Sequence, residues 1–284
     1  MYTTALTTVA FATLAAAGPL NLRSDYTVGP FNACSASDRA QTSCVNTTAI
    51  QDSCCIETRG GQLLQTQFWD WNPATGPSAS WTIHGLWPDR CDSSYEGFCD
   101  PSREVTGDQI TQIISDIGGH NLLRYMRRYW KDDASVDGNL WSHEFNKHAT
   151  CFSSGRPQCY SGIPAPGTTP AKGSTNPRKD VFDFFYRTTE LFKGLDTYAV
   201  LKAGGITPSN TKTYTLDQIQ GAIKTAYGVT ATVGCINNTL SEMWYHFHVK
   251  GGNVYDGEYL PINGGPSTCK ATGIRYPPKV NPEA

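Results

Sequence analysis

Trp81-Thr-Ile-His-Gly-Leu-Trp-Pro-Asp89 is the stretch around which the rest of this sequence is organised. Its first four residues alternate in a way that predicts a β-strand, with Thr82 and His84 on one face. Gly85 and Pro88 interrupt strands, so we expect this strand to end just after His84. The pattern therefore predicts a histidine where a strand opens into a loop, which is a common position for catalytic groups.

A second stretch, Trp141-Ser-His-Glu-Phe-Asn-Lys-His-Ala-Thr-Cys151, contains no glycine or proline and predicts a helix over its whole length. Glu144 and His148 are four residues apart and share one face of that helix, and so do His143 and Lys147. One face of the helix thus carries an acid–base pair, and an adjacent face carries two potential cations.

Internal cleavage of RNA requires groups of these kinds. A base removes the 2′-hydroxyl proton, an acid protonates the departing 5′-oxygen, and cationic donors hold the charge that builds on phosphate. Histidine suits both proton roles at mildly acidic pH. We therefore predict that His84 and His148 flank a phosphate, which His143, Glu144 and Lys147 hold and polarise. This chemistry needs no metal or other cofactor, and DNA is excluded because it lacks the 2′-hydroxyl.

A zinc site is the competing interpretation, because His143, Glu144 and His148 resemble the metal-binding pattern H-E-x-x-H. Here the two histidines are five residues apart instead of four. On an ideal helix of about 100° per residue they point roughly 140° apart. The spacing therefore disfavours a metallohydrolase.

The aromatic residues beside His84 predict a base-binding pocket. Trp87 lies after the glycine, where we expect the chain to turn outward, and it can stack on a base. Asp89 can accept a hydrogen bond from a base amino group, and Tyr95 offers a second aromatic face. Stacking recognises any base, which predicts a single-stranded substrate and little base specificity. Trp81, by alternation, is expected in the core.

Length and composition indicate one folded domain. The 284 residues are 39% hydrophobic and 17% charged, which is typical of a globular protein and excludes a disordered or fibrous one. The formal net charge of −2 argues against binding of nucleic acid by broad electrostatic attraction, although a small cationic pocket is compatible with it.

The N-terminus and the cysteines indicate export. Residues 1–17 are apolar, end in three alanines and predict a signal peptide; a plain N-terminal tail is the alternative, and the run is too short for a membrane span. Ten cysteines predict five disulfides, and Asn46 and Asn237 are N-glycosylation acceptors. We therefore expect a secreted, extracellular protein, or one that reaches a vacuole or lysosome by the secretory route.

Helices and strands are predicted to mix without regular alternation, which favours an α+β fold. Capping boxes at Thr106 and Thr215 begin two helices. Further helices are expected over 122–130, over 141–151 and from Asn176-Pro177 to Leu195. Strands are expected over 67–71, 229–236, 244–250 and 253–260, with Gly251-Gly252 as the last turn, and 160–177 is expected to be an inserted flexible loop.

Both quoted stretches resemble the two active-site segments of the ribonuclease T2 family of acid endoribonucleases, and secreted microbial members most closely. The resemblance implies a single disulfide-stapled domain over 18–284, with a central, mostly antiparallel sheet flanked by helices. It implies His148 as the general base and His84 as the general acid, roles that reverse when a 2′,3′-cyclic phosphate is hydrolysed to 3′-phosphate ends. It also implies that His143 binds phosphate, that Glu144 and Lys147 stabilise the transition state, and that Trp87, Asp89 and Tyr95 bind a base.

The disulfides come from the resemblance as well. It implies the pairs Cys34–Cys55, Cys44–Cys91, Cys54–Cys159, Cys99–Cys151 and Cys235–Cys269. Leu140 departs from the family, whose members often carry an aromatic residue there for a second base. We expect a monomer that acts on single-stranded RNA and has no membrane association. A binding or signalling protein on the same scaffold is the alternative, and His246 and His248 are expected to be structural.

Overall fold

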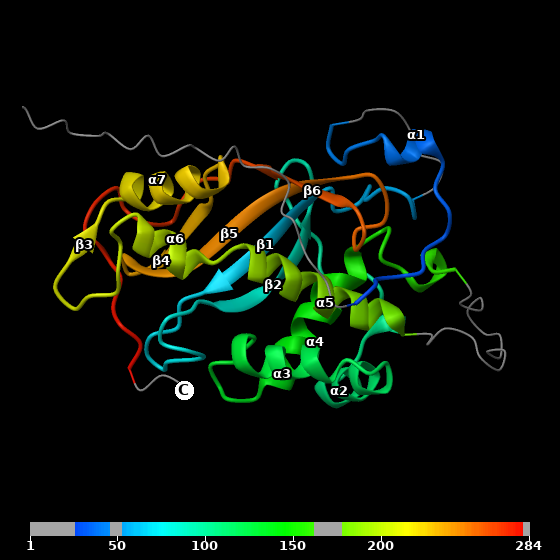
Figure 1. Cartoon of the computed structure of the whole chain (residues 1–284), viewed down its shortest axis with the longest axis horizontal. Helices are drawn as coiled ribbons and strands as arrows, with labels where there is room; N and C mark the ends of the chain where they lie inside the picture. The colour runs from blue at the N-terminus through cyan, green and yellow to red at the C-terminus, as the bar shows by residue number, and fades with distance from the viewer. Residues whose placement is uncertain (1–25, 46–52, 162–177, 281–284) are drawn as a thin grey trace, which may run out of the picture.

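Figure 1 shows the computed structural model, in which residues 26–45, 53–161 and 178–280 are described. Within them, seven strands form one sheet in the order β2-β1-β5-β7-β3, with β4 and β6 also paired to β5. All pairs are antiparallel except the short β5–β7 contact. The strands are β1 (Gln62–Phe68), β2 (Thr82–Asp89), β3 (Thr213–Tyr214), β4 (Thr232–Ile236), β5 (Thr239–Lys250), β6 (Glu258–Ile262) and β7 (Ile274–Arg275).

The helices flank this sheet, and α2, α3 and α4 gather beyond its β2 edge (Figure 1). They are α1 (Ala36–Arg39), α2 (Gly107–Asp116), α3 (His120–Tyr129), α4 (Asp137–Lys147), α5 (Lys179–Gly194), α6 (Thr197–Ala203) and α7 (Leu216–Tyr227). Both capping boxes are present, at Thr106 and at Thr215. The predicted α+β fold with a mostly antiparallel sheet is confirmed.

Strand β5 has one face in the hydrophobic core and the opposite face partly exposed. Its residues Met243, Tyr245 and Phe247 are buried in the core, as alternation requires for one face of a strand. Glu242 and Trp244 belong to the opposite face and are partly exposed. The long helix α5 packs on the sheet next to β1 and β2. One face of the sheet is therefore filled, and the other is available for polar side chains.

The prediction that Gly85 and Pro88 end the strand is wrong, because β2 continues through both to Asp89. Strand β2 lies at the edge of the sheet and, in the described part of the chain, pairs only with β1. A proline is tolerated on an edge strand, where its missing N–H need not serve a second neighbour. His84 accordingly lies inside a strand and not at a loop.

Several other boundaries also differ from expectation. The strand predicted over 67–71 is β1, which begins at Gln62, and β5 begins at Thr239 instead of 244. Asn237 and Asn238, both with positive φ, form a two-residue turn between β4 and β5, the type that asparagine favours. Strand β6 begins only at Glu258, so Gly251-Gly252 is part of a longer connection.

All five predicted disulfides are formed, with the implied pairing: Cys34–Cys55, Cys44–Cys91, Cys54–Cys159, Cys99–Cys151 and Cys235–Cys269. Cys99–Cys151 joins the loop after β2 to the end of the segment that carries His148. The bridges therefore fix the irregular segments around the sheet.

Removing Cys54–Cys159 by a double serine substitution should destabilise the fold more than removing Cys34–Cys55. The bridges span 105 and 21 residues, and chain entropy predicts losses of about 4.7 and about 3 kcal/mol respectively. Urea unfolding of both variants measures the difference. Equal losses would show that the stabilisation does not come from closing the longer loop.

Some expectations fall outside the described residues. These are the signal peptide over 1–17, the glycosylation acceptor Asn46, the helix start at Asn176-Pro177, and the loop over 160–177 apart from its first two residues. Asn237 is described and is exposed in its turn. None of the described helices combines the length and the apolar character that crossing a membrane requires.

Candidate active site

His84 is presented by a β-bulge. Thr66 of β1 pairs with Gly85, but the next residue, Gln67, pairs with Ile83, so His84 is the extra residue of β2. Bulges re-aim side chains, and this one brings His84 and Trp87 to one face although they are three residues apart. Their rings meet edge to face at 4.7 Å. Alternation alone would place them on opposite faces.

Two contacts, one with Phe68 and one with Glu242, hold the His84 ring. The ring stacks on Phe68 at 3.8 Å, and Nδ1 lies 3.1 Å from the Oε1 atom of Glu242 on β5. The backbone carbonyl of His84 accepts a hydrogen bond from the indole N–H of Trp130 at 2.9 Å. A carboxylate on Nδ1 fixes the imidazole tautomer and leaves Nε2 to face the site.

Glu144 lies at the centre of the cluster and is completely buried. Its Oε2 atom accepts a hydrogen bond from the Trp87 indole at 2.8 Å and lies 3.9 Å from Nε2 of His148. Its Oε1 atom lies 3.6 Å from Nε2 of His84. Burial raises the pKa of this carboxyl, although the nearby His84 opposes the shift.

Gly85 makes room for Glu144. A Cβ atom at this position would lie 1.9 Å from Oε2 of Glu144, and no two such atoms can approach that closely. The backbone N–H of Gly85 donates to the Thr66 hydroxyl at 3.0 Å, which holds the bulge in place. The glycine is therefore needed because the carboxylate closely approaches the strand, and not because it ends the strand.

His148 occupies the end of α4. The helix stops at Lys147, His148 is its C-cap, and a short 3₁₀ turn follows over Ala149–Cys151, so the predicted continuous helix over 141–151 is wrong. The His148 ring stacks on Trp87 at 5.0 Å and 15°. Its Nε2 has no hydrogen-bond partner among the described residues. Burial, reinforced by the charge of Lys147, lowers its pKa well below the ordinary value.

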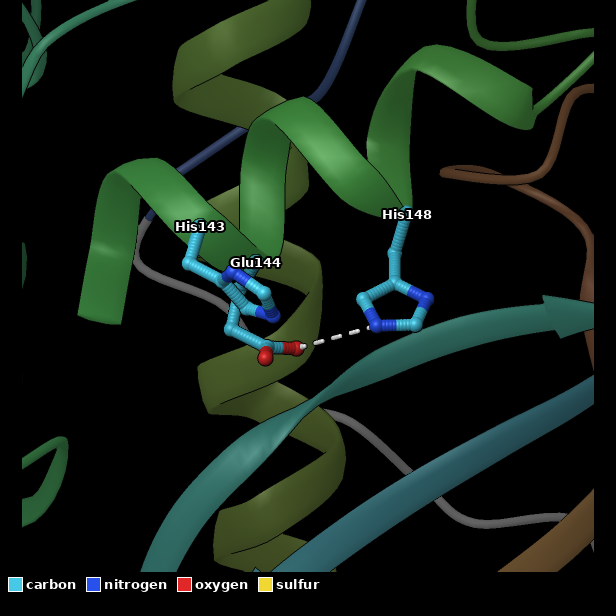
Figure 2. Close-up of side chains that lie close together, drawn as sticks. All are labelled: His143, Glu144 and His148. Carbon is cyan, nitrogen blue, oxygen red and sulfur yellow. Dashed lines mark ion pairs between the residues drawn. The ribbon is translucent and has the colours of Figure 1, made fainter. Parts of the chain in front are cut away.

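Figure 2 shows His143, Glu144 and His148 converging from α4 and its C-terminal end. One possible ligand atom from each lies within 4.8 Å of the others. The angular argument made from an ideal helix is therefore wrong here, because the helix ends before His148. Histidine nitrogen and carboxylate oxygen are donors that zinc accepts. Removal of metal by a chelator is accordingly part of the test proposed below.

His143 and Lys147 line the outer side of the cluster. His143 is exposed, with its ring 6.4 Å from that of His148 and 6.1 Å from that of Phe98. Partial burial and the charge of Lys147 lower the pKa of His143. The ammonium group of Lys147 and the imidazole of His143 thus stand between the buried carboxyl and solvent, where a phosphate can reach them.

The predicted base-binding residues lie in three different settings. Trp87 is packed between His148 and Trp244, whose ring meets it at 5.5 Å, so it does not turn outward as expected. Asp89 ends β2, and burial raises its pKa to about 7. Tyr95 is 68% exposed in the following loop. Trp81 is in the core, as predicted.

Two comparisons identify the family. The model of the Ribonuclease T2 family matches residues 60–257, which include both histidine stretches. The chain belongs to the ribonuclease T2 family. It is an RNA-cleaving endoribonuclease, as its similarity to curated ribonucleases T2 also indicates.

Fungal ribonucleases T2 are among its relatives. Ribonuclease T2 of Aspergillus oryzae is 45% identical over 239 residues, 84% of this chain and 81% of that protein. Ribonuclease Trv of Hypocrea rufa is 46% identical over 84% of this chain and 95% of its own. The crystal structure of Actibind, described as a T2 ribonuclease, superimposes with a TM-score of 0.77 at 42% identity, covering 88% of this chain and 100% of that one.

Sequence reasoning missed Glu242 and Trp244 on β5, which complete this ribonuclease T2 site from the far side. An acidic residue two positions before Trp244, and therefore on the same strand face, was the available signal. His246 is buried and bonded to Thr232 and Gln62, which agrees with the structural role expected for it.

Proposed function

We propose that the protein cleaves single-stranded RNA with little base specificity, first by transphosphorylation to a 2′,3′-cyclic phosphate and then by hydrolysis to 3′-phosphate ends. The supporting observation is that His84 and His148, from segments about sixty residues apart, both approach one buried carboxyl group. Two imidazoles in this arrangement can reach both oxygens that exchange protons during the reaction.

His148 acts as the base of the first step. Its lowered pKa keeps the imidazole neutral to acidic pH, so Nε2 can accept the 2′-hydroxyl proton. The 2′-oxygen attacks phosphorus as the bond to the 5′-oxygen breaks, and His84 gives that oxygen a proton. In the second step His84 removes a proton from water and His148 returns one to the 2′-oxygen.

Glu144, Lys147 and His143 stabilise the charge on the phosphate oxygens. The raised pKa of Glu144 favours its neutral carboxyl form, which can donate a hydrogen bond to an anionic oxygen. Lys147 supplies a cationic donor, and the His143 imidazole supplies an N–H donor, on the exposed side. No step in this scheme requires a metal ion or another cofactor.

Trp87, Asp89 and Tyr95 bind the base. Tyr95 has an exposed ring available for stacking. The raised pKa of Asp89 means that it donates a hydrogen bond below about pH 7 and accepts above it. Trp87 also donates a hydrogen bond to Glu144 and stacks on His148, so it links the base-binding residues to the catalytic groups.

The protein is exported as a monomer that carries its activity in residues 18–284. The predicted leader over 1–17 and the five disulfides support an oxidising compartment, either extracellular or a vacuole or lysosome. Asn237, exposed in a turn, and Asn46 are the proposed glycan acceptors.

Cleavage of single-stranded RNA between pH 4 and 8, with and without EDTA, tests this function. We expect a 2′,3′-cyclic phosphate intermediate and full activity in the chelator. Because the pKa of His148 is lowered, the neutral base persists at acidic pH, and activity should be retained towards the acidic end of this range. Loss of activity in EDTA would favour the metal site, and no cleavage by the oxidised protein would favour a binding scaffold.

Glu242→Gln should lower kcat about tenfold, because a hydrogen bond to an ionised carboxylate is about twice as strong as one to a neutral amide oxygen. Glutamine keeps an acceptor 3.1 Å from Nδ1 of His84 but removes its negative charge. Steady-state cleavage of single-stranded RNA measures the loss. Glu258→Gln, an exposed change on neighbouring β6, is the control, and identical kcat values for the two variants would remove Glu242 from the mechanism.

A further inference from the structure

A groove of about 480 Å³ lies between α3 and α5, and none of its lining residues belongs to the catalytic cluster. Its volume is within the range of small-molecule sites. The two helices contact each other. Its floor is apolar and includes Leu122, Phe182 and Tyr186, all buried.

The charge of the groove is predominantly positive. Among the described residues its lining holds three cations, Arg124, Arg128 and Lys193, and a single carboxylate, Glu190. Lys193 pairs with Glu190 at 2.6 Å, but neither arginine forms an ion pair in the described part of the chain. Arg124 donates to Asn121, and Arg128 donates to the Tyr129 hydroxyl. Two uncompensated guanidinium groups are notable in a chain whose formal charge is −2.

Aromatic rings alternate with these cations. Tyr125 and Tyr129 lie one helical turn apart with ring centroids 4.5 Å from each other, and both are only partly buried. Lys193 lies over the Tyr125 ring at 4.7 Å, and Arg128 lies over the Tyr129 ring at 5.6 Å. Cations that follow a backbone, interleaved with aromatic faces on which bases stack, are the features of a single-strand binding groove.

We propose that this groove is a second binding site for single-stranded RNA, which holds a segment of the chain away from the scissile phosphate. Arg124 and Arg128 would contact two phosphates, and a base would pack against the aromatic pair formed by Tyr125 and Tyr129. This proposal rests on the proposed function only in taking RNA as the polymer that binds.

Helix α3 connects the two sites. Residues along its whole length, from Asn121 to Tyr129, line the groove, and just after its C-terminal end Trp130 donates its indole N–H to the carbonyl of His84. An RNA segment that occupies the groove therefore lies against the same helix that supports the bulge. Substrates too short to span both sites should not use the groove.

The test compares Arg124→Gln/Arg128→Gln with Arg127→Gln. Arg127 is exposed on the same helix but does not line the groove, so it is a matched control for charge and helix position. The probe is a single-stranded 2′-deoxy oligonucleotide, which this mechanism cannot cleave, and its affinity is measured by fluorescence anisotropy across a range of salt concentrations. Each lost phosphate contact lowers the slope of log affinity against log salt by about 0.7, so the double variant should lose about 1.4.

Cleavage supplies the second readout. The double variant should raise KM for long RNA about tenfold and leave kcat/KM for a dinucleotide unchanged. An unchanged salt slope, or a slope change equal to that of Arg127→Gln, would overturn the proposal even if RNA is cleaved normally. Conversely, groove-dependent binding without any RNA cleavage would support this site and refute the proposed function. If the double variant bound inorganic phosphate more weakly but bound the oligonucleotide as tightly as the wild type, the groove would be a site for free anions instead.

Discussion

Replacing His148 by phenylalanine should lower kcat at least a hundredfold and up to about ten thousandfold, the usual contribution of one general acid or base. Phenylalanine can keep the stacking on Trp87, and it fills a buried position without adding a polar group. The fold should therefore survive while the proton acceptor is lost. His84→Phe should have an effect of the same size, because it removes the proton donor.

Steady-state cleavage of single-stranded RNA measures both effects, and thermal unfolding verifies that each variant is folded. His120→Phe is the control, since His120 is exposed at the start of α3, outside the catalytic cluster. Activity within a factor of a few of the wild type in either variant would refute the proton role assigned to that histidine. Loss of activity in His120→Phe would mean that the assay reports folding instead of chemistry.

Gly85→Ala should reduce activity about a hundredfold or more, although it adds only one methyl group. That methyl would lie 1.9 Å from Oε2 of Glu144, so the carboxyl must leave its position between the two histidines or push α4 away from β2. Either movement also breaks the hydrogen bond from the Trp87 indole. A single electrostatic group at a reacting centre contributes about a hundred- to a thousandfold.

Gly221→Ala is the matched control for this substitution. Gly221 lies inside α7, and nothing lies within 4 Å of a Cβ placed there. Alanine in a helix interior should stabilise the fold by roughly 0.5–1 kcal/mol and leave cleavage unchanged. If Gly85→Ala retained full activity, the position of Glu144 would not matter for catalysis. A crystal structure of Gly85→Ala would show where the carboxyl moves.

Much of this protein follows from local patterns in its sequence. The capping boxes at Thr106 and Thr215 were predicted because N-cap and N3 residues interact within one turn. The chemical character of the site was predicted from two short stretches, since it depends on which side chains are present. The disulfide pairing came from the family resemblance and not from the residues themselves, because ten cysteines allow many pairings.

Only the tertiary structure decided how those side chains meet. The bulge at His84 depends on the register between β1 and β2, which alternation within one strand cannot reveal. Glu242 reaches His84 across 158 residues of sequence, through strand pairing that a local pattern does not encode. Gly85 was predicted to end a strand because local sequence does not show why a glycine is needed there. The reason is the close approach of Glu144, which belongs to a distant segment of the chain. The sequence by itself determined which side chains the candidate site contains and where two helices are capped, whereas long-range packing decided how those side chains meet, because contacts between distant segments are set by the whole fold.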